Sequence, residues 1–558
     1  MKNSLPEAVV ATPTTRRQWL SLLVLGLGLA IVIIDGTIVN VVLPAISRDF
    51  DANLRGLQWV TSLYALVYAA LIVTFGRIGD QFGRRLLFVL GVLVFVAGSA
   101  LSGAASSIGM LIGARALQGL GAAMTSPSTL SIISSTFTGR TRGVAFGVWG
   151  AIAGAAAALG PLLGGWLTTV ASWRWAFYIN LPIGAVAVVG AFLLVDESKA
   201  GTKHADIDWL GILFISVGIG ALVLGLIQGQ AYGWVRPRGD FALGSWAWPF
   251  GAFSVSLVSF AAAALGVIAF VLWELHRGRT GREPLFDLGL LRYRGFRYGL
   301  ITVSIVALGE FGVIFVLSLY LQGVLGYTAL KTGLTFLPFA ALTLVVAPSA
   351  GLLSARFGPK WVVTAGMLLE ALFIIILSRV LAIDTTQLTV IFILLGYGVG
   401  IGLAIAQLTN VVLSEVPADR VGAGSGANNT LRQIGSALGI AIIGAVLSST
   451  LSLSAHERLT SSTTVPDFVK TAIVSSLDKG ATLGEGSFKV SGAPPGMENT
   501  AAFKQIEQII RYSFVDATRA AALVAGLFVL LGAASSLFIP RTLRRTSVGA
   551  EKKEAPHV

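Results

Sequence analysis

Uninterrupted blocks of about 20 apolar residues recur along the whole chain, and they restrict its fold more than any other feature. A helix of this length crosses the roughly 30 Å hydrocarbon core of a bilayer. A transmembrane β-barrel is excluded, because its strands alternate apolar and polar residues over segments of about ten residues. Only 12% of the residues are charged, about half the share found in a soluble domain. The pattern therefore predicts an all-α membrane protein.

Fourteen spans are predicted from these blocks, with six in each half of the chain and two between the halves. In chain order they cover Trp19–Leu43, Leu57–Phe75, Leu86–Ala104, Ile108–Ile133, Val144–Val170, Trp175–Val195, Trp209–Ile227, Trp248–Trp273, Tyr298–Leu321, Gly333–Leu353, Trp361–Leu381, Leu388–Leu413, Ala423–Leu447 and Thr518–Ile539. The span from Trp248 to Trp273 is the least clearly defined, because it is rich in Ala, Ser and Gly.

The distribution of arginine predicts that both termini lie on the cytoplasmic side of the cell (inner) membrane, since cytoplasmic loops carry an excess of basic residues. An external loop is expected at about 448–516. Its residues 503–514 have apolar positions at helical spacing, which predicts either a helix on the outer membrane surface or an extension of the last span. The expected organisation is a cytoplasmic tail at 1–18, a six-helix half at 19–195, an inserted pair with linkers at 196–297, a second six-helix half at 298–539 and a cytoplasmic tail at 540–558.

Composition also excludes several classes of partner and cofactor. The net charge of +13 does not indicate nucleic-acid binding, because the basic residues lie in short loops between apolar blocks. The chain has no cysteine, and its four histidines lie in predicted loops or the tail, so no metal site is expected. Gly119-Leu-Gly121 lies inside a span without the lysine of a phosphate-binding loop, so no nucleotide is expected. The expected partners are the bilayer, protons and small molecules, with the protein acting as a monomer.

One loop motif occurs twice. Gly76-Arg-Ile-Gly-Asp80-Gln-Phe-Gly83-Arg84-Arg85 joins the second and third spans, and residues 351–360 join the tenth and eleventh, 275 residues later. Gly, Phe, Gly and a basic residue recur in register. Two related six-helix halves with an inserted pair explain this repeat, and repeated halves are typical of secondary transporters whose substrate binds near the midplane between them.

Few charged residues lie inside the predicted spans, where each costs several kcal/mol unless it faces protein or water. They are Asp35, Arg115, Glu310, Glu370 and Arg432. Asp35 and Glu310 are candidates for binding a proton or a cationic substrate. The alternative is a buried structural ion pair with Arg115 or Arg432. Glu370 has no motif around it and is the weaker candidate.

The fifth span combines glycines with a proline, in Gly150-Ala-Ile-Ala-Gly154 and Gly160-Pro161-Leu-Leu-Gly164-Gly165. Proline removes a helical hydrogen bond and kinks the axis, and glycines allow a neighbouring helix to approach closely. A plain kinked structural helix is the alternative. Trp149 in this span, and Phe311, Phe315 and Tyr320 near Glu310, either line an apolar pocket or face lipid.

Four stretches together resemble the major facilitator superfamily, and within it the fourteen-span drug:proton antiporter family. They are the loop motif Gly76 to Arg85, Arg115-Ala-Leu-Gln118-Gly119 in the fourth span, Gly160-Pro161-Leu-Leu-Gly164-Gly165 in the fifth, and Ile34-Asp35-Gly-Thr-Ile-Val-Asn40-Val-Val-Leu-Pro44 in the first. The resemblance covers nearly the whole chain. It implies the major facilitator fold with 14 transmembrane helices, two six-helix halves plus a central inserted pair.

The resemblance also implies roles for these residues. Gly76, Asp80, Gly83, Arg84 and Arg85 would form a conformational latch between the halves on the cytoplasmic side. Arg115 would tune protonation or hold a carboxylate. Ala355 stands where the second loop would have the acid, so the second latch is expected to be weaker. Export would be marked by Gly154, Gly160, Pro161, Gly164 and Gly165. Further similarity appears in residues 58–64, in residues 173–182 around Asn180, and in residues 429–435. Substrate-binding candidates in the first-span motif and in or beside these stretches are Asn40, Tyr64, Asn428 and Arg432.

The predicted function is proton-coupled export of small hydrophobic or cationic compounds, of the multidrug efflux type, driven by the proton gradient without a cofactor. Asp35 is expected to be the main proton carrier and Glu310 the substrate-linked acid. Export of an endogenous lipid, a siderophore or a secondary metabolite by the same mechanism is the alternative, and an uptake symporter is less favoured. An enzyme is not expected, because no catalytic cluster appears in the loops.

Overall fold

The computed structural model describes residues 15–540, except for 53, 200–207, 238–240, 244–245, 250, 283, 418–419, 463–464, 466–469 and 471–500. Within the helices a few further side chains, including that of Asn40, also lie outside the described set. The predicted tails are therefore covered only at 15–18 and 540, and most of the predicted external loop is not described.

The first half of the chain forms long helices joined by short turns, as the apolar blocks predict. Its sixth span is a broken helix: α6 ends at Tyr178 and α7 begins at Asn180, with Pro182 in the first turn, where a missing backbone N–H is tolerated. The bounds are α1 Arg16–Phe50, α2 Leu54–Phe82, α3 Arg84–Gly103, α4 Ile108–Thr136, α5 Gly139–Val170, α6 Trp175–Tyr178 and α7 Asn180–Leu194.

The inserted segment contains α8 (Trp209–Tyr232), a small ribbon of β1 (Ala242–Leu243) and β2 (Trp246–Ala247), α9 (Val255–Arg279) and the 3-10 helix η1 (Leu288–Arg292). The predicted start of the eighth span at Trp248 is wrong by seven residues. Ser254 caps α9 by accepting a hydrogen bond from the backbone N–H of Leu257. Trp248 lies outside the helix, where its indole N–H donates to the Phe253 carbonyl at 2.9 Å.

The second half repeats the pattern with longer helices. They are α10 Arg294–Gly323, α11 Ala329–Phe357, α12 Pro359–Val380, α13 Gln387–Ser414, α14 Val421–Thr460 and α16 Ala501–Ser536. Both α14 and α16 extend well past their predicted spans. Of the two predictions for residues 503–514, the extension of the last span is therefore correct, and the helix lying on the membrane surface is wrong.

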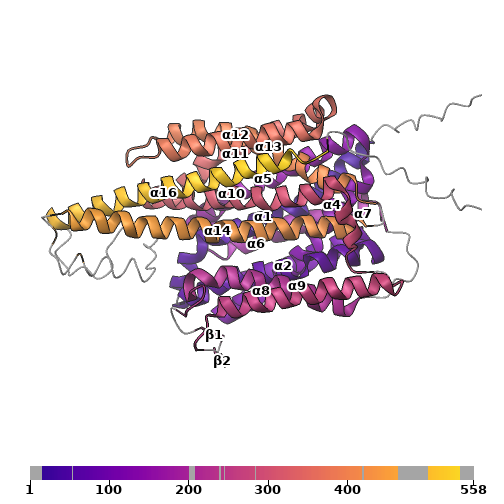
Figure 1. Cartoon of the computed structure of the whole chain (residues 1–558), viewed down its shortest axis with the longest axis horizontal. Coiled ribbons are helices and arrows are strands. Elements are labelled where there is room, and N and C mark those ends of the chain that lie inside the picture. The colour runs from indigo at the N-terminus through magenta and orange to yellow at the C-terminus, as the bar shows by residue number, and fades with distance from the viewer. Residues whose placement is uncertain are drawn as a thin grey trace, which may run out of the picture.

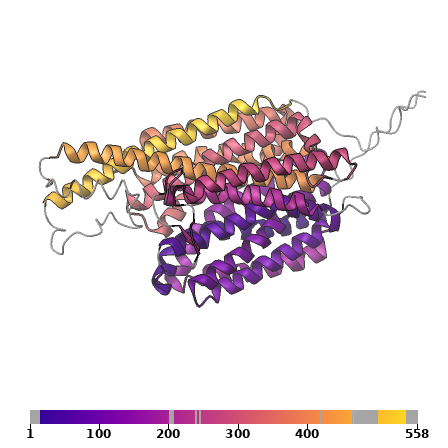
Figure 2. The ribbon, with the colours of Figure 1, turned by 60° about the horizontal axis from the view of Figure 1, so that its bottom comes forward.

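These extensions stabilise each other. Asp516 on α16 accepts hydrogen bonds from Arg458 at 2.8 Å and Ser454 at 3.0 Å, both on α14. Leu451 and Ile510 belong to the same buried cluster. In Figures 1 and 2 the two helices project side by side beyond the other helices, α14 in orange and α16 in yellow. Pairing of their apolar faces explains why the helices continue outside the predicted spans.

Thirteen helical segments in the described part of the chain are long and apolar enough to cross a membrane, with α6 and α7 counted as one segment. The fourteenth predicted span is α4, which has 29 residues but lacks a continuous stretch as apolar as those of the other thirteen. Its polar side chains are buried within the protein, among them Arg115, Gln118 and the run from Thr125 to Ser131. Because α4 packs between α2 and α3, it needs less apolar surface than a helix that faces lipid.

Figure 2 shows the N-terminal helices, coloured indigo to purple, gathered on one side of the molecule and the orange and yellow C-terminal helices on the other. The halves meet through the pairs α5–α11, α2–α14, α5–α13 and α4–α14. The inserted helices α8 and α9 pair with each other, and α8 packs against α2 and α14 at the side of the bundle (Figure 1). The inserted pair therefore touches both halves.

Candidate functional site

A buried carboxylate stands in the first half, on α1. Asp35 has no exposed surface, and its Oδ2 forms an ion pair with the guanidinium of Arg115 on α4. Gln118, one helical turn after Arg115, donates from Nε2 to Asp35 Oδ1 at 2.8 Å and accepts from Arg115 Nη1 at 2.8 Å. Residues three apart share a helix face, so Arg115 and Gln118 reach the same carboxylate together.

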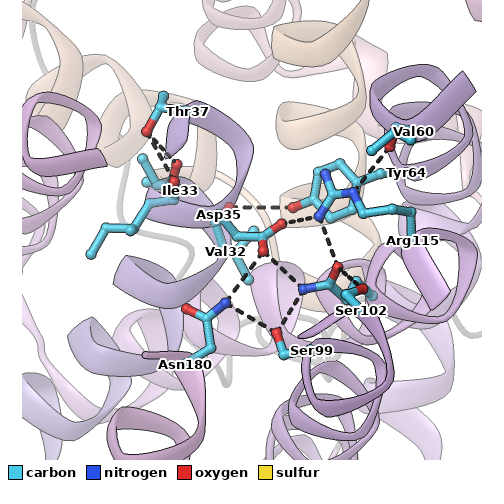
Figure 3. Close-up of polar contacts among 12 residues, drawn as sticks. Val32, Ile33, Asp35, Thr37, Val60, Tyr64, Ser99, Ser102, Arg115 and Asn180 are labelled. Atoms are coloured by element: carbon cyan, nitrogen blue, oxygen red, sulfur yellow. Dashed lines mark hydrogen bonds and ion pairs between the residues drawn. The ribbon is translucent and has the colours of Figure 1, made fainter. Parts of the chain in front are cut away.

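Polar groups from three more helices complete this network (Figure 3). Asn180, the first residue of α7, donates to Asp35 Oδ1 at 3.3 Å and to Ser99 Oγ at 3.0 Å. Arg115 also donates from Nε to the Val60 carbonyl at 3.0 Å, and its guanidinium lies 4.2 Å from the centre of the Tyr64 ring. The ion pair with Arg115 that the sequence left open is thus present, and both carboxylate oxygens of Asp35 are satisfied.

The glycine and proline motif of α5 packs against two different helices, α1 and α11. A β-carbon at Gly160 would overlap Thr37 Oγ1, and one at Gly164 would lie 2.9 Å from Ile38, so this part of α5 packs closely on α1 beside Asp35. A β-carbon at Gly154 would instead lie 3.1 Å from Thr343 of α11, in the other half. The same helix therefore contacts the acid-bearing helix of its own half and the surface of the opposite half. Pro161 and Gly165 lie in the part near α1.

The second half has a carboxylate at the equivalent position. Glu310 on α10 follows Asp35 by 275 residues, the same offset as the repeated loop. It is 4% exposed, and its Oε2 lies 3.7 Å from Arg432 on α14, too far for a hydrogen bond. Glu310 Oε1 has no hydrogen-bond partner among the described residues. The Arg432 side chain is 22% exposed, whereas that of Arg115 is 1% exposed, so this ion pair is looser and less enclosed.

Two further polar side chains are buried near Glu310. Glu370 on α12 has no exposed surface, and neither of its carboxyl oxygens has a hydrogen-bond partner within the described part of the chain. The hydroxyl of Tyr397 on α13 is also buried without such a partner. Glu310 and Arg432 interact electrostatically with both side chains. Buried polar atoms without partners are uncommon, and they often mark functional sites.

The predicted latch connects the two halves at one end of the molecule, which we call the latch end. Asp80 is fully buried and pairs with Arg84 at 2.7 Å. Its Oδ2 accepts a hydrogen bond at 3.2 Å from the backbone N–H of Ala423, in the first turn of α14. Asp80 thus places a negative charge at the N-terminus of a helix from the other half, where the helix dipole favours it. A β-carbon at Gly76 would overlap the Gly422 carbonyl, so only glycine allows this approach.

The remaining latch residues act within the first half. Gly83 has φ +134°, which favours glycine, and lets the chain turn from α2 into α3. The Arg85 guanidinium donates to the Val195 carbonyl at 3.1 Å and lies 4.0 Å from Glu197. Glu197 also accepts from the backbone N–H of Arg85 at 3.0 Å. These contacts join the latch loop to the segment after α7.

Other contacts between the halves lie close to the same end. Ser131 and Ser425 share a hydrogen bond at 3.0 Å, Arg142 donates to the Leu413 carbonyl at 2.7 Å, and Gln407 donates to the Gly143 carbonyl at 3.1 Å. In the repeated loop of the second half, Ala355 and its neighbour Arg356 are exposed. The absence of an acid at position 355 therefore coincides with a loop that does not reproduce the Asp80 contact.

The predicted substrate-binding side chains do not lie at one place. Phe311 is half-buried, with its ring centre 6.0 Å from the Arg432 guanidinium, and Phe315 is half-buried one turn later. Tyr320 is fully buried and donates to the Ala382 carbonyl, roughly 15 Å along α10 from Glu310. Trp149 and Asn428 are buried, with the indole N–H and the amide oxygen lacking described partners.

A cavity of about 220 Å³ lies between α2, α8 and α14. Its wall includes Ala69 of α2, Val223 of α8, and Gln433 and Ser436 of α14. Gln433 directly follows Arg432 in α14, but neither Arg432 nor Glu310 belongs to the lining of the cavity. None of the aromatic side chains predicted to bind substrate belongs to its lining.

Sequence reasoning did not assign roles to several residues that complete these networks. Gln118 and Asn180 lie within recognised motifs, and a buried amide in a predicted span is a signal that could have identified them. Ser99 and Glu197 carry no such signal, because serine is common in membrane helices and Glu197 lies in a loop.

A family model and two known proteins match most of this chain. The family model described as Major Facilitator Superfamily matches residues 25–209 and 208–440. The chain is 34% identical over 466 residues to the multidrug resistance protein Stp of Mycobacterium tuberculosis (strain CDC 1551 / Oshkosh), covering 83% of this chain and 81% of Stp. It is 31% identical over 538 residues to the tetracenomycin C resistance and export protein of Streptomyces glaucescens, covering 96% and 94% of the two chains.

A solved structure shares the fold. The crystal structure of the human organic anion transporter MFSD10 superposes with a TM-score of 0.55 at 13% sequence identity, over 93% of this chain and 99% of MFSD10. At this identity the likeness concerns the arrangement of helices alone.

Proposed function

The chain belongs to the major facilitator superfamily, and we propose that it exports small hydrophobic or cationic compounds in exchange for protons. Support comes chiefly from the two buried carboxylates at equivalent positions, Asp35 and Glu310, each facing an arginine inside its half. Ionisable groups inside a membrane are costly and generally mark ion or proton pathways. Similarity to proteins named for drug resistance and antibiotic export favours export over uptake.

We place the latch end at the cytoplasmic face of the cell membrane, together with both chain termini. The arginine-rich loops support this orientation, because positive residues accumulate on that side. The protein would then be closed towards the cytoplasm in this structure, with Asp80 bonded to α14. Transport by alternating access requires these contacts to break when the site opens inward. A monomer is sufficient for this cycle.

Asp35 is assigned as the main proton carrier and Glu310 as the substrate-linked acid, with Arg115 and Arg432 as their counter-charges. The cavity between α2, α8 and α14 is assigned to substrate, because its wall is largely apolar and two polar side chains, Gln433 and Ser436, can orient a ligand. The same site would accept a secondary metabolite. The resemblance to the tetracenomycin C export protein supports that as a second candidate substrate class.

The driving force sets limits on coupling. One proton moving down 100 mV gains about 2.3 kcal/mol, and one pH unit adds about 1.4 kcal/mol. A neutral substrate exchanged for one proton can therefore be concentrated about 500-fold. For a monovalent cation exchanged for one proton the voltage term cancels, and about tenfold remains per pH unit. Efficient export of cations requires more than one proton per cycle.

Transport by the purified full chain in proteoliposomes tests the proposed function. Ethidium serves as a lipophilic cation and Nile red as an uncharged lipophilic dye, with proton movement followed by an internal pH dye. We expect each transported probe to cause proton flux in the opposite direction. We expect Asp35→Asn to abolish coupling for every probe, and Glu310→Gln to affect ethidium more than Nile red. Normal coupling in the Asp35→Asn protein would refute the assignment of Asp35.

A further inference from the structure

Glu370 occupies an unusual position for an acidic side chain. It lies in the middle of α12, and its side chain has no exposed surface. A β-carbon at Gly400 would lie 2.6 Å from Glu370 Cγ, so the glycine leaves space on α13 for the acidic side chain. Neither carboxyl oxygen accepts a hydrogen bond from any described group. Glu370 therefore sits inside the second half without the donors that surround Asp35.

The charged and titratable groups near Glu370 come from three helices. They are Glu310 of α10, Tyr397 of α13 and Arg432 of α14, each of which interacts electrostatically with Glu370. Helices α11 and α16 also pack against α12, but no described titratable group on them acts on Glu370. One arginine is therefore shared by two carboxyl groups, and it lies next to Glu310 at 3.7 Å.

This arrangement decides which form of the carboxyl group the site can hold. An ionised carboxylate needs a nearby counter-charge or hydrogen-bond donors when it is removed from water. Among the described residues Glu370 has no hydrogen-bond donor, and the one cation near it, Arg432, already faces Glu310. Two neighbouring carboxyl groups also disfavour double ionisation. The uncharged, protonated form of Glu370 fits the site, and the ionised form does not.

We propose that Glu370 is a second proton-binding group of the transport cycle, coupled to Glu310 through their shared neighbour Arg432. This inference rests on the proposed proton-coupled export. In the present structure Glu370 holds its proton while Arg432 neutralises Glu310. The proton on Glu370 is additional to the one assigned to Asp35, so two protons accompany each substrate.

Helix α14 provides the means of release, because it carries Arg432 and also forms the contact between the halves. Its first turns contact Asp80 and Ser131 of the first half. When these contacts break, α14 moves and Arg432 can approach Glu370. The O–H bond of Glu370 then breaks, the proton passes to a water molecule, and the guanidinium neutralises the new carboxylate. Opening of the latch end and release of this proton are thereby linked.

Infrared spectroscopy of the purified full chain in lipid tests the proton on Glu370 without any transport. A protonated carboxyl group has a carbonyl stretch that a carboxylate or an amide lacks. We expect this band at neutral pH in the unmodified protein, with the intensity of one carboxyl group lost in Glu370→Gln but not in the matched variant Glu507→Gln. Glu507 is a partly exposed residue of α16 paired with Arg511. An unchanged band intensity in Glu370→Gln, or the absence of the band from the unmodified protein, would overturn the proposal.

If Glu370→Gln does not fold, labelling of the unmodified protein with dicyclohexylcarbodiimide tests the proposal instead. This apolar reagent attacks protonated carboxyl groups, and mass spectrometry locates the product in the unmodified protein. Labelling of Glu370 ahead of Asp35 supports the proposal. Labelling of Asp35 or Glu310 with Glu370 unmodified contradicts it.

Ethidium transport driven by voltage alone tests the proton count. Two protons exchanged for one monovalent cation move one net charge, so 100 mV without a pH gradient should support an ethidium gradient of about 50-fold. In Glu370→Gln we expect this voltage response to disappear, while a pH gradient still drives ethidium export. A preserved voltage response in Glu370→Gln would refute the second site. If the unmodified protein transports no ethidium, the proposed function fails for this probe, and the infrared experiment still judges Glu370.

Discussion

Asp35 and Glu310 stand at equivalent positions of two related halves, yet their surroundings differ in almost every respect. Asp35 is enclosed by Arg115, Gln118 and Asn180, and both of its oxygens are satisfied. Glu310 faces Arg432 at 3.7 Å and shares it with a second acid that has no described partner. Networks that satisfy every polar atom make a structure rigid, whereas partly satisfied networks allow rearrangement. We infer that Asp35 gains and loses its proton among a fixed set of partners, whereas in the second half Arg432 changes the carboxyl group with which it pairs.

Helix packing around the two acids is nevertheless the same. Gly160 and Gly164 of α5 recur as Gly435 and Gly439 of α14, again 275 residues later. A β-carbon at Gly435 would overlap the Ser304 carbonyl, and one at Gly439 the Leu308 carbonyl, both on the helix that carries Glu310. The close contact between an interface helix and an acid-bearing helix therefore belongs to both halves. The difference lies in the polar side chains that were added to this common framework.

Removal of the arginine that pairs with each acid should lower stability more than the other substitutions do. The loss should be larger for Arg115 than for Arg432. Arg115→Leu leaves the Asp35 charge buried without a counter-charge, which destabilises a protein by about 3–5 kcal/mol. Arg432→Leu should cost less, because the Arg432 side chain is partly exposed and its ion pair is longer. Thermal unfolding of the purified variants measures the difference. The double variant Asp35→Asn/Arg115→Leu should regain much of the lost stability, and equal losses for the two arginines would contradict the comparison.

Adding a methyl group to the shared packing should affect both halves alike. Gly160→Ala and Gly435→Ala each force a β-carbon into the backbone or side chain of the adjacent helix, and overpacking of this kind costs about 1–3 kcal/mol. Gly113→Ala on α4 is the control, because its β-carbon would meet nothing within 4 Å. Unfolding temperatures and transport rates of the three variants should separate the first two from the third. A tolerated Gly435→Ala beside a damaging Gly160→Ala would show that the packing is not equivalent.

Removal of the latch charge should slow transport without unfolding the protein. Asp80→Asn can still accept a hydrogen bond from Ala423, but it loses the ion pair with Arg84 and the interaction with the helix dipole of α14. A shift of about 1–3 kcal/mol between the two conformations would change turnover roughly 5- to 150-fold. Turnover in proteoliposomes at equal protein content measures this change. A variant that transports at the normal rate would rule out the latch role.

Addition of an acid to the repeated loop of the second half should have the smallest effect on turnover and stability. Ala355→Asp places an acid at the position equivalent to Asp80, but Ala355 is exposed, so water and salt screen the new charge. Substitutions at such surface positions usually stay within about 0.5 kcal/mol. We expect turnover and unfolding temperature to match those of the unmodified protein. A marked slowing would indicate that the second loop forms a latch in another conformation.

The acid–arginine pair in each half could be predicted only in part from the sequence. Asp35 was correctly recognised as a buried charge that needs a partner, because an acid within an apolar block has no other way to avoid its desolvation cost. The charged residues by themselves left Arg115 and Arg432 open as partners, and the resemblance implied that Arg115 tunes protonation or holds a carboxylate. The packing of α4 against α1 and α2 brings Arg115 and Asp35 together, although they are 80 positions apart.

The sequence by itself determined the membrane-spanning character, the number of spans and the repeat of the two halves. These properties depend on local hydropathy and on residue identity, which the chain carries regardless of how its helices pack. Even so, α9 begins after Trp248 and α16 continues through 503–514, because helix ends depend on capping and on neighbouring helices. Tertiary structure alone decided which carboxyl groups have partners. Among the described residues it leaves Glu370 without a hydrogen-bond partner, because Arg432 faces Glu310 instead.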